Sequence, residues 1–220
     1  MNQTNSDAIT ALNAYMTALP QALQASASHY VDSFNDQPQE SLAWLLQAPA
    51  KFPESLVKVF ACSEFVAKKC LSNPSLIKDL YVSGDLFHSY AQQSYKENLA
   101  PLIASVTDAQ QLGQQLRRFR QREMIRITWR DIAGWADLQE TVVDLSNLAE
   151  ACIAAAVDLL QQWLEQSVGK PCDSDGNGQA MIVIAMGKLG AHELNFSSDV
   201  DLIFVFPQNG ATQGAGRSIS

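Results

Sequence analysis

Apolar residues recur at steps of three and four from about Ser6 to Leu164, which is the period of amphipathic α-helices. The clearest stripe begins at Leu138 and continues to Leu164, and it predicts one long helix. Asp137 followed by Glu140 is a capping pair at its start. Breaks between helices are predicted at turn-forming residues, namely Pro38, Pro49, Pro53, the Asn73-Pro74 pair, Gly84 with Asp85, and Gly134. The pattern has no repeat period, so it predicts a bundle of about seven or eight helices rather than a solenoid.

The pattern changes after residue 168. Residues 169–179 are polar and rich in turn formers, which predicts a linker. Two short apolar runs follow, AMIVIAM at 180–186 and LIFVF at 202–206, and both are typical of strands. Because a continuously apolar strand is usually covered on both faces, the two runs are expected in a buried sheet. The predicted fold class is therefore mainly α, with a helical region at 1–168 and the first strands of an α/β domain at 180–220.

The connection between the two predicted strands reads GKLGAHELNFSSDVD. Gly187 and Gly190 allow the backbone to approach a ligand closely and expose N–H groups at the start of a helix, which suits a phosphate. Ser197 and Ser198 are candidate hydrogen-bond donors to the same phosphate. This connection is therefore the predicted phosphate-binding or nucleotide-binding segment.

Two aspartates lie at the start of the second predicted strand. Asp199 and Asp201 are two residues apart, so their carboxylates are expected on the same face. Carboxylates together with phosphate oxygens and water are the ligands that Mg²⁺ prefers, and a metal clamp of this kind serves in-line displacement at phosphorus. The spacing alone is a weak signal, whereas its combination with the preceding strand and glycine turn is a stronger one.

This order of strand, small-residue turn and Asp-apolar-Asp-apolar strand resembles the polymerase-β-like nucleotidyltransferase superfamily. The chain departs from that pattern at Lys188, where the superfamily usually has glycine or serine. Two alternatives follow from the difference. Either Lys188 contacts phosphate itself, or Ser197 and Ser198 supply the hydroxyl.

A narrower resemblance rests on three segments. GKLGAHELNFSSDVDLIFVF, at Gly187–Phe206, closely resembles the GKLG…ELN…SSD.DL signature of the glutamine synthetase adenylyltransferase/adenylyl-removing enzyme family. WRDIAG at Trp129–Gly134 and LSNLAE in the helix after it are also similar to that family. The motifs cover roughly the last hundred residues, and the earlier helices match only in general character.

The resemblance implies a function. Members carry two nucleotidyltransferase domains in one long chain, and this chain is similar to the beginning of the N-terminal half, which removes AMP from a tyrosine of glutamine synthetase. That reaction is a Mg²⁺-dependent phosphorolysis that yields ADP. The implied partners are glutamine synthetase, the PII signalling protein, nucleotide (ADP or ATP) and phosphate, with glutamine as a further regulator.

By the same resemblance, Asp199 and Asp201 are the catalytic metal ligands. The residues implied to shape the phosphate site are Gly187, Lys188, Gly190, Ser197 and Ser198. The fold normally takes a third carboxylate from a later strand, which the residues after Phe206 do not supply. The chain is therefore expected to be a fragment that is weak or inactive alone.

Two other functions are weighed against this one. The uridylyltransferase of the PII protein has a similar motif, but that family usually reads GGYGR where this chain reads GKLGA. A helical docking or regulatory module without activity is the second alternative, and the intact Asp-Val-Asp segment argues against it.

Arginines repeat every four residues before Trp129 and around it, which predicts a stripe along one helix face. Its members are Arg118, Arg122, Arg126 and Arg130. One hypothesis is a docking surface for an acidic partner or a nucleotide phosphate. The other, which we favour, is a solvated or internally paired face with Glu123 and Asp131 as local partners. His192 is interpreted as a surface residue rather than a general base.

Net charge and cysteine spacing limit the expected partners and the expected cellular location. A net charge of −8 argues against a surface built for nucleic acid or anionic membrane. The cysteines Cys62, Cys70 and Cys152 have the spacing of buried helix faces, and no CxxC pair occurs. The N-terminus has no basic segment before an apolar stretch, and no run reaches the roughly 18 to 20 apolar residues of a membrane span. We therefore expect reduced cysteines and a cytoplasmic location, with neither nucleic acid nor membrane as a partner.

Overall fold

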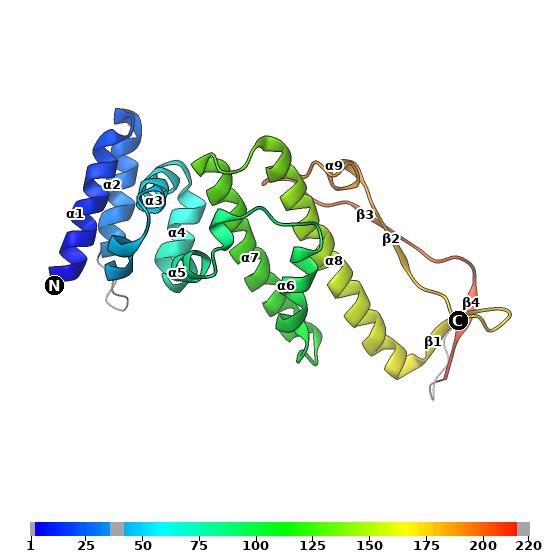
Figure 1. Cartoon of the computed structure of the whole chain (residues 1–220). Coiled ribbons are helices and arrows are strands. Elements are labelled where there is room, and N and C mark those ends of the chain that lie inside the picture. The colour runs from blue at the N-terminus through cyan, green and yellow to red at the C-terminus, as the bar shows by residue number, and fades with distance from the viewer. Residues whose placement is uncertain (1–2, 36–41, 215–220) are drawn as a thin grey trace. The chain divides into compact units, whose positions relative to one another are not determined.

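The structure is a computed structural model that describes residues 3–35 and 42–214 (Figure 1). The predicted mainly α class is confirmed, since nine α-helices and a few short antiparallel strands form within these ranges. The α-helices are α1 (Gln3–Ala18), α2 (Gln21–Asn35), α3 (Lys51–Cys62), α4 (Glu64–Ser72), α5 (Ser75–Val82), α6 (Ser94–Ile103), α7 (Ala109–Ala133), α8 (Leu138–Val168) and α9 (Gly187–Gly190). Two 3-10 turns are η1 (Leu42–Gln47) and η2 (Asp85–Phe87). Across the described ranges, none of the helices combines the length and the apolar character that crossing a bilayer requires.

Local signals place most helix ends where the sequence predicts them. Asp137 Oδ1 accepts the Glu140 N–H at 2.7 Å, which confirms the capping pair of α8. The predicted breaks at the Asn73-Pro74 pair and at Gly134 are confirmed, and Gly134 ends α7 with a φ of 75° that favours glycine. Pro53 instead lies in the first turn of α3, where a helix tolerates proline. The predicted break at Pro38 is outside the described residues.

Two compact units make up the chain. Unit 1 comprises Met1–Ser89 and Met124–Thr141, and unit 2 comprises Tyr90–Glu123 and Val142–Ser220. Helices α7 and α8 therefore each contribute to both units. Unit 2 contains the strands together with α6 and most of α8. The predicted domain limits at 168 and 180 stay a prediction.

Unit 1 is built around a buried aromatic cluster. Trp129 is fully buried and stacks on Phe52, with ring centroids 5.5 Å apart and an interplanar angle of 5°. Its indole N–H donates to Ser55 Oγ at 2.9 Å, so the one polar atom of the ring is satisfied inside the core. The tryptophan of the WRDIAG segment thus packs in the core of unit 1.

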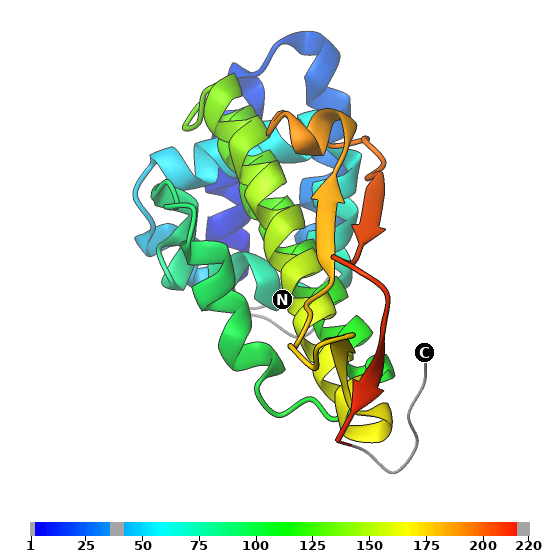
Figure 2. The same ribbon diagram turned by 90° about the vertical axis from the view of Figure 1, so that its right-hand side faces the viewer.

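Unit 2 contains two antiparallel hairpin-like pairs. Strand β1 (Lys170–Asp173) pairs with β4 (Gly210–Gln213), and β2 (Ile182–Ala185) pairs with β3 (Leu202–Val205). The predicted strands are therefore present, and the segment 169–179, which was expected to be a linker, contains a strand of its own. Figure 2 shows β2 and β3 alongside the long helix α8.

The expectation of a buried sheet is wrong. In the β2–β3 register, Val183 and Leu202 belong to the face that lines a cavity with α8. The opposite face carries Ile182, Ile184 and Ile203, which are 48%, 44% and 45% exposed. The reason is geometric. A two-stranded pair covered by one helix leaves much of its second face in solvent.

Candidate functional site

The turn after β2 depends on two glycines for different reasons. Gly187 has a φ of 57°, which L-residues with a side chain adopt at a cost, and a Cβ at this position would meet no atom within 4 Å. A Cβ on Gly190 would lie only 2.5 Å from the carbonyl oxygen of Ala185. Gly190 is therefore required for close packing of the single turn α9 on the end of β2. The first N–H groups of this turn, beginning at Gly187, have no acceptor inside it, as at any helix start.

The two predicted serines are organised by a neighbouring asparagine. Asn195 Oδ1 accepts the Ser198 hydroxyl at 2.6 Å, the Ser197 hydroxyl at 3.4 Å and the Ser197 N–H at 3.2 Å. In this arrangement both hydroxyl protons point to Asn195, and the serine oxygens retain their capacity to accept. Asn195 was not predicted. Its signal was an asparagine followed by serines two and three residues later, which is typical of an Asx turn.

The two aspartates enter β3 from an exposed segment. The N–H of Met186 donates to the carbonyl of Asp201 at 2.9 Å, which extends the β2–β3 ladder by one residue pair. By strand alternation, Asp201 shares the exposed face with Ile203. Asp199 is exposed two residues earlier.

The chemistry of this donor set fits Mg²⁺, which takes one or two carboxylates and keeps several water ligands. Asp199 and Asp201 would be the residues that hold it. Within residues 3–35 and 42–214, no cluster of three or more His, Cys, Asp or Glu side chains is arranged to bind a metal ion. Lys188 is exposed in α9.

His192 differs from its interpretation as a surface residue. The side chain is half-buried, and both ring nitrogens contact α8: Nε2 lies 3.0 Å from Asn147 Oδ1 and Nδ1 lies 3.2 Å from Glu150 Oε1. Two residues later, the N–H of Leu194 donates to Ser146 Oγ at 3.1 Å. The LSNLAE segment of α8 is therefore the surface on which the loop between β2 and β3 lies.

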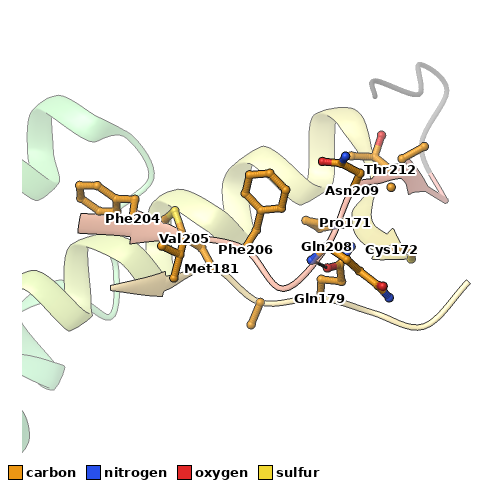
Figure 3. A pocket seen from close by; sticks show the side chains of 13 residues that line it. Pro171, Cys172, Gln179, Met181, Phe204, Val205, Phe206, Gln208, Asn209 and Thr212 are labelled. Atoms are coloured by element: carbon orange, nitrogen blue, oxygen red, sulfur yellow. Dashed lines mark hydrogen bonds between the residues drawn. The ribbon is translucent and has the colours of Figure 1, made fainter. Parts of the chain in front are cut away.

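Two cavities flank the β2–β3 pair, and neither is lined by the predicted metal ligands. One of about 520 Å³ lies between α8 and the strands. The other, of about 500 Å³, is mainly apolar, and Figure 3 shows Phe204 and Met181 toward one end, Phe206 near the middle, and Thr212 and Cys172 toward the other end. The Gln208 N–H donates to Gln179 Oε1 at 3.0 Å. The aspartates therefore lie on an open surface rather than inside a closed pocket.

The four arginines of the predicted stripe fall in different environments. Arg118 is exposed, and Arg122 Nη1 lies 2.6 Å from Glu123 Oε1, the local partner that was expected. Arg126 and Arg130 are buried, and each donates to a backbone carbonyl of unit 1. Arg126 and Arg130 thus agree with the favoured interpretation of an internally paired face, because a buried guanidinium with internal partners is not available to another protein. The docking hypothesis is left with Arg118 and Arg122.

Comparison with known proteins identifies a family that covers most of the chain. The family described as glutamate-ammonia ligase adenylyltransferase matches residues 53–220. A bifunctional glutamine synthetase adenylyltransferase/adenylyl-removing enzyme of Nitrosococcus oceani is 45% identical over 204 residues, which are 92% of this chain and 21% of that protein. Proteins of the same name from Shewanella loihica and Pseudomonas aeruginosa are 46% and 41% identical over 165 and 180 residues, or 75% and 81% of this chain and 17% and 18% of theirs.

These matches first define a class, since the relatives are by name adenylyltransferases and hence nucleotidyltransferases. The chain belongs to the glutamate-ammonia ligase adenylyltransferase family. It spans about a fifth of the length of the relatives it matches. Of the two nucleotidyltransferase families weighed from the sequence, the match selects this one over the uridylyltransferase of the PII protein.

Proposed function

We propose that this chain belongs to the half of the bifunctional enzyme that removes AMP from the modified tyrosine of glutamine synthetase by phosphorolysis. Family membership supports the substrate class. The single observation that carries the site is the pair Asp199 and Asp201, intact and exposed where β3 begins beside the α9 turn. This is the arrangement that a metal-assisted displacement at phosphorus needs.

The proposed reaction needs only inorganic phosphate and the adenylylated tyrosine as reactants. An oxygen of inorganic phosphate forms a new bond to the phosphorus of the AMP group, and the bond from that phosphorus to the tyrosyl oxygen breaks. The products are ADP and the free tyrosine side chain. Mg²⁺ bound at the site would neutralise charge on the transferring group and on the leaving oxygen.

The residues of the chain have distinct tasks in this proposal. Asp199 and Asp201 hold the metal through their exposed carboxylates. Lys188 supplies a positive charge near the anionic reactants, and the N–H groups at the start of α9 face the phosphate. The Ser198 hydroxyl, which donates to Asn195 Oδ1 in this structure, would turn to donate to a bound phosphate. The proposed partners and location follow the family: glutamine synthetase as substrate, the PII protein and glutamine as regulators, and the cytoplasm as compartment.

The test measures ADP release from adenylylated glutamine synthetase with phosphate and Mg²⁺, using a protein of the relatives' length that contains these residues. Asp199→Asn and Asp201→Asn are each expected to lower kcat at least about a hundredfold, because each removes a metal-binding charge at the reacting phosphorus. Asp175→Asn removes the same charge from an exposed turn and is the matched control, with unchanged activity expected.

Three results would contradict the proposal in different ways. Unchanged activity in both aspartate variants would reject the metal assignment. Release of AMP without a requirement for phosphate would reject phosphorolysis. Loss of adenylyl transfer to unmodified glutamine synthetase, with removal intact, would place these aspartates in the other half of the enzyme.

A further inference from the structure

Three hydrogen-bond or ion-pair contacts join the loop between β2 and β3 to α8. His192 contacts Asn147 and Glu150, and the N–H of Leu194 donates to Ser146. Asn147 and Glu150 are three residues apart and therefore share one face of the helix. The imidazole spans this spacing with its two nitrogens, at 3.0 Å and 3.2 Å. Both contacted atoms are oxygens, which accept hydrogen bonds from a ring N–H.

The backbone at His192 is in a conformation that its side chain alone does not favour. Its φ is 60°, in the left-handed region, and it is the one non-glycine residue with positive φ among those the structure describes. Such a conformation persists where the surroundings compensate for it. The two ring contacts to α8, together with the buried side chains of Leu189 and Leu194 on either side, are the compensating interactions.

The residues that contact α8 are direct sequence neighbours of the residues of the proposed site. Leu194, whose N–H is held by Ser146, directly precedes Asn195, and Asn195 accepts from Ser197 and Ser198. Asp199 follows immediately. On the other side, α9 ends only two residues before His192. The anchor therefore lies at the centre of the segment that carries every predicted phosphate-binding and metal-binding residue.

We propose that His192 is a positioning residue that fixes the β2–β3 loop on α8 through Asn147 and Glu150, and so sets the placement of the phosphate-binding turn and of Asp199. The anchoring stands on the contacts alone, while its importance for turnover rests on the proposed function. His192 touches neither metal nor substrate in this proposal.

The first measurement is hydrogen exchange of the loop amides without metal or substrate, in a protein of the relatives' length. His192→Gly is the informative variant, because glycine adopts the native φ without strain while both ring contacts are lost. Loss of one of the two His192 contacts is expected to speed exchange of the Leu194 amide roughly fivefold. Loss of both contacts is expected to speed it further. Asn147→Ala is expected to act in the same direction, and the double variant to exchange no faster than His192→Gly alone. Gln162→Ala, which truncates an exposed amide on the same helix, is the control.

Two further variants separate anchoring from general destabilisation. Glu150→Gln keeps an oxygen acceptor for Nδ1 of His192, so its loop amides are expected to exchange at the wild-type rate. Glu150→Ala has no such acceptor, so its loop amides are expected to exchange faster. His192→Gly is expected to leave the thermal midpoint unchanged or higher, because it relieves the left-handed backbone. Loop exchange equal to wild type in His192→Gly, or exchange that rises equally throughout unit 2, would overturn the anchor.

The second measurement is the kinetics of ADP release with adenylylated glutamine synthetase. His192→Gly and Asn147→Ala are expected to lower kcat at least fivefold with KM for the protein substrate unchanged, and to raise the Mg²⁺ concentration for half-maximal rate. Faster loop exchange with unchanged kcat would reduce His192 to a structural residue and overturn the positioning role. A wild-type protein that shows the exchange pattern but releases no ADP would instead refute the proposed function and leave the anchor standing.

Discussion

Replacement of Gly190 by alanine tests whether this glycine serves packing rather than ligand approach. The new Cβ would lie 2.5 Å from the Ala185 oxygen and 3.2 Å from its carbonyl carbon. Carbon–oxygen contacts are ordinarily about 3.3 Å or longer, so α9 and the end of β2 must separate by roughly 0.8 Å. Both atoms belong to the backbone or are fixed to it, and no rotamer change relieves the contact.

The expected cost follows from two opposing effects. Overpacking of this kind costs about 1–3 kcal/mol, and the lower chain entropy of alanine in the unfolded state returns about 0.4–1 kcal/mol. Gly190→Ala is thus expected to lower the local free energy of opening by about 1–2 kcal/mol. Gly187→Ala meets open space but has a φ of 57°, so its cost of about 1–2 kcal/mol comes from the backbone alone. Gly178→Ala has neither problem and is the neutral control.

Native-state hydrogen exchange of the β2 amides, measured by mass spectrometry over a urea series, reports these free energies for the hairpin itself. The three variants should also differ in ADP release, since Gly190→Ala moves α9 away from the end of β2. If Gly190→Ala opens no more readily than Gly178→Ala, the close approach of α9 to β2 is not a constraint, and the packing role of Gly190 is refuted.

Two further predictions concern buried groups. Arg130→Met removes a guanidinium that lies 2.6 Å from the half-buried Glu140 carboxylate and that also donates to the carbonyl of Leu86. The free energy of unfolding of unit 1 should therefore fall by about 1–3 kcal/mol, whereas Glu140→Gln keeps an acceptor and should cost clearly less. Equal effects in urea titrations followed by tryptophan fluorescence would contradict the buried pairing. Burial raises the pKa of Cys152 to about 11, so its alkylation should rise about tenfold per pH unit between pH 7 and 10. At pH 8, exposed Cys62 should react first and buried Cys70 last, and peptide mapping that finds Cys70 labelled before Cys62 would contradict the burial.

Helices were predictable because their signals are local. The capping pair Asp137 and Glu140 uses atoms three residues apart, and Gly134 ends a helix through its own φ. Neither depends on what the rest of the chain does. The strands at 182–185 and 202–205 were predictable for a similar reason, since short β-branched runs between turn formers have few other stable conformations.

What surrounds each element was less predictable. An apolar run such as IVIA predicts cover on both faces, yet the face with Ile184 and Ile203 is open in the described residues. The expected position of Cys62 on a buried face is also wrong, since it is exposed at the last residue of α3. Periodicity gives the relative orientation of side chains on one element, and burial depends on a second element that the period does not specify.

The arginine series shows the same limit with charged groups. A four-residue repeat places Arg122, Arg126 and Arg130 near one helix face, but it does not indicate whether that face meets water or protein. Arg130 became structural because Glu140 and the carbonyl of Leu86, ten and 44 residues away in sequence, converge on it. These contacts depend on tertiary packing, which the spacing of residues within one helix does not predict.

The candidate site combines both kinds of information. Two of its resembling segments, LSNLAE and GKLGAHELNFSSDVD, are about 40 residues apart, and the sequence alone does not indicate that they touch. In the structure they meet, because Ser146, Asn147 and Glu150 hold Leu194 and His192. A single loop on two short strands would be too mobile to keep two carboxylates and a phosphate-binding turn in fixed relation, since a two-stranded pair is marginal alone. Contacts between the centre of this loop and a 31-residue helix would supply the rigidity that the proposed metal site requires of its ligands.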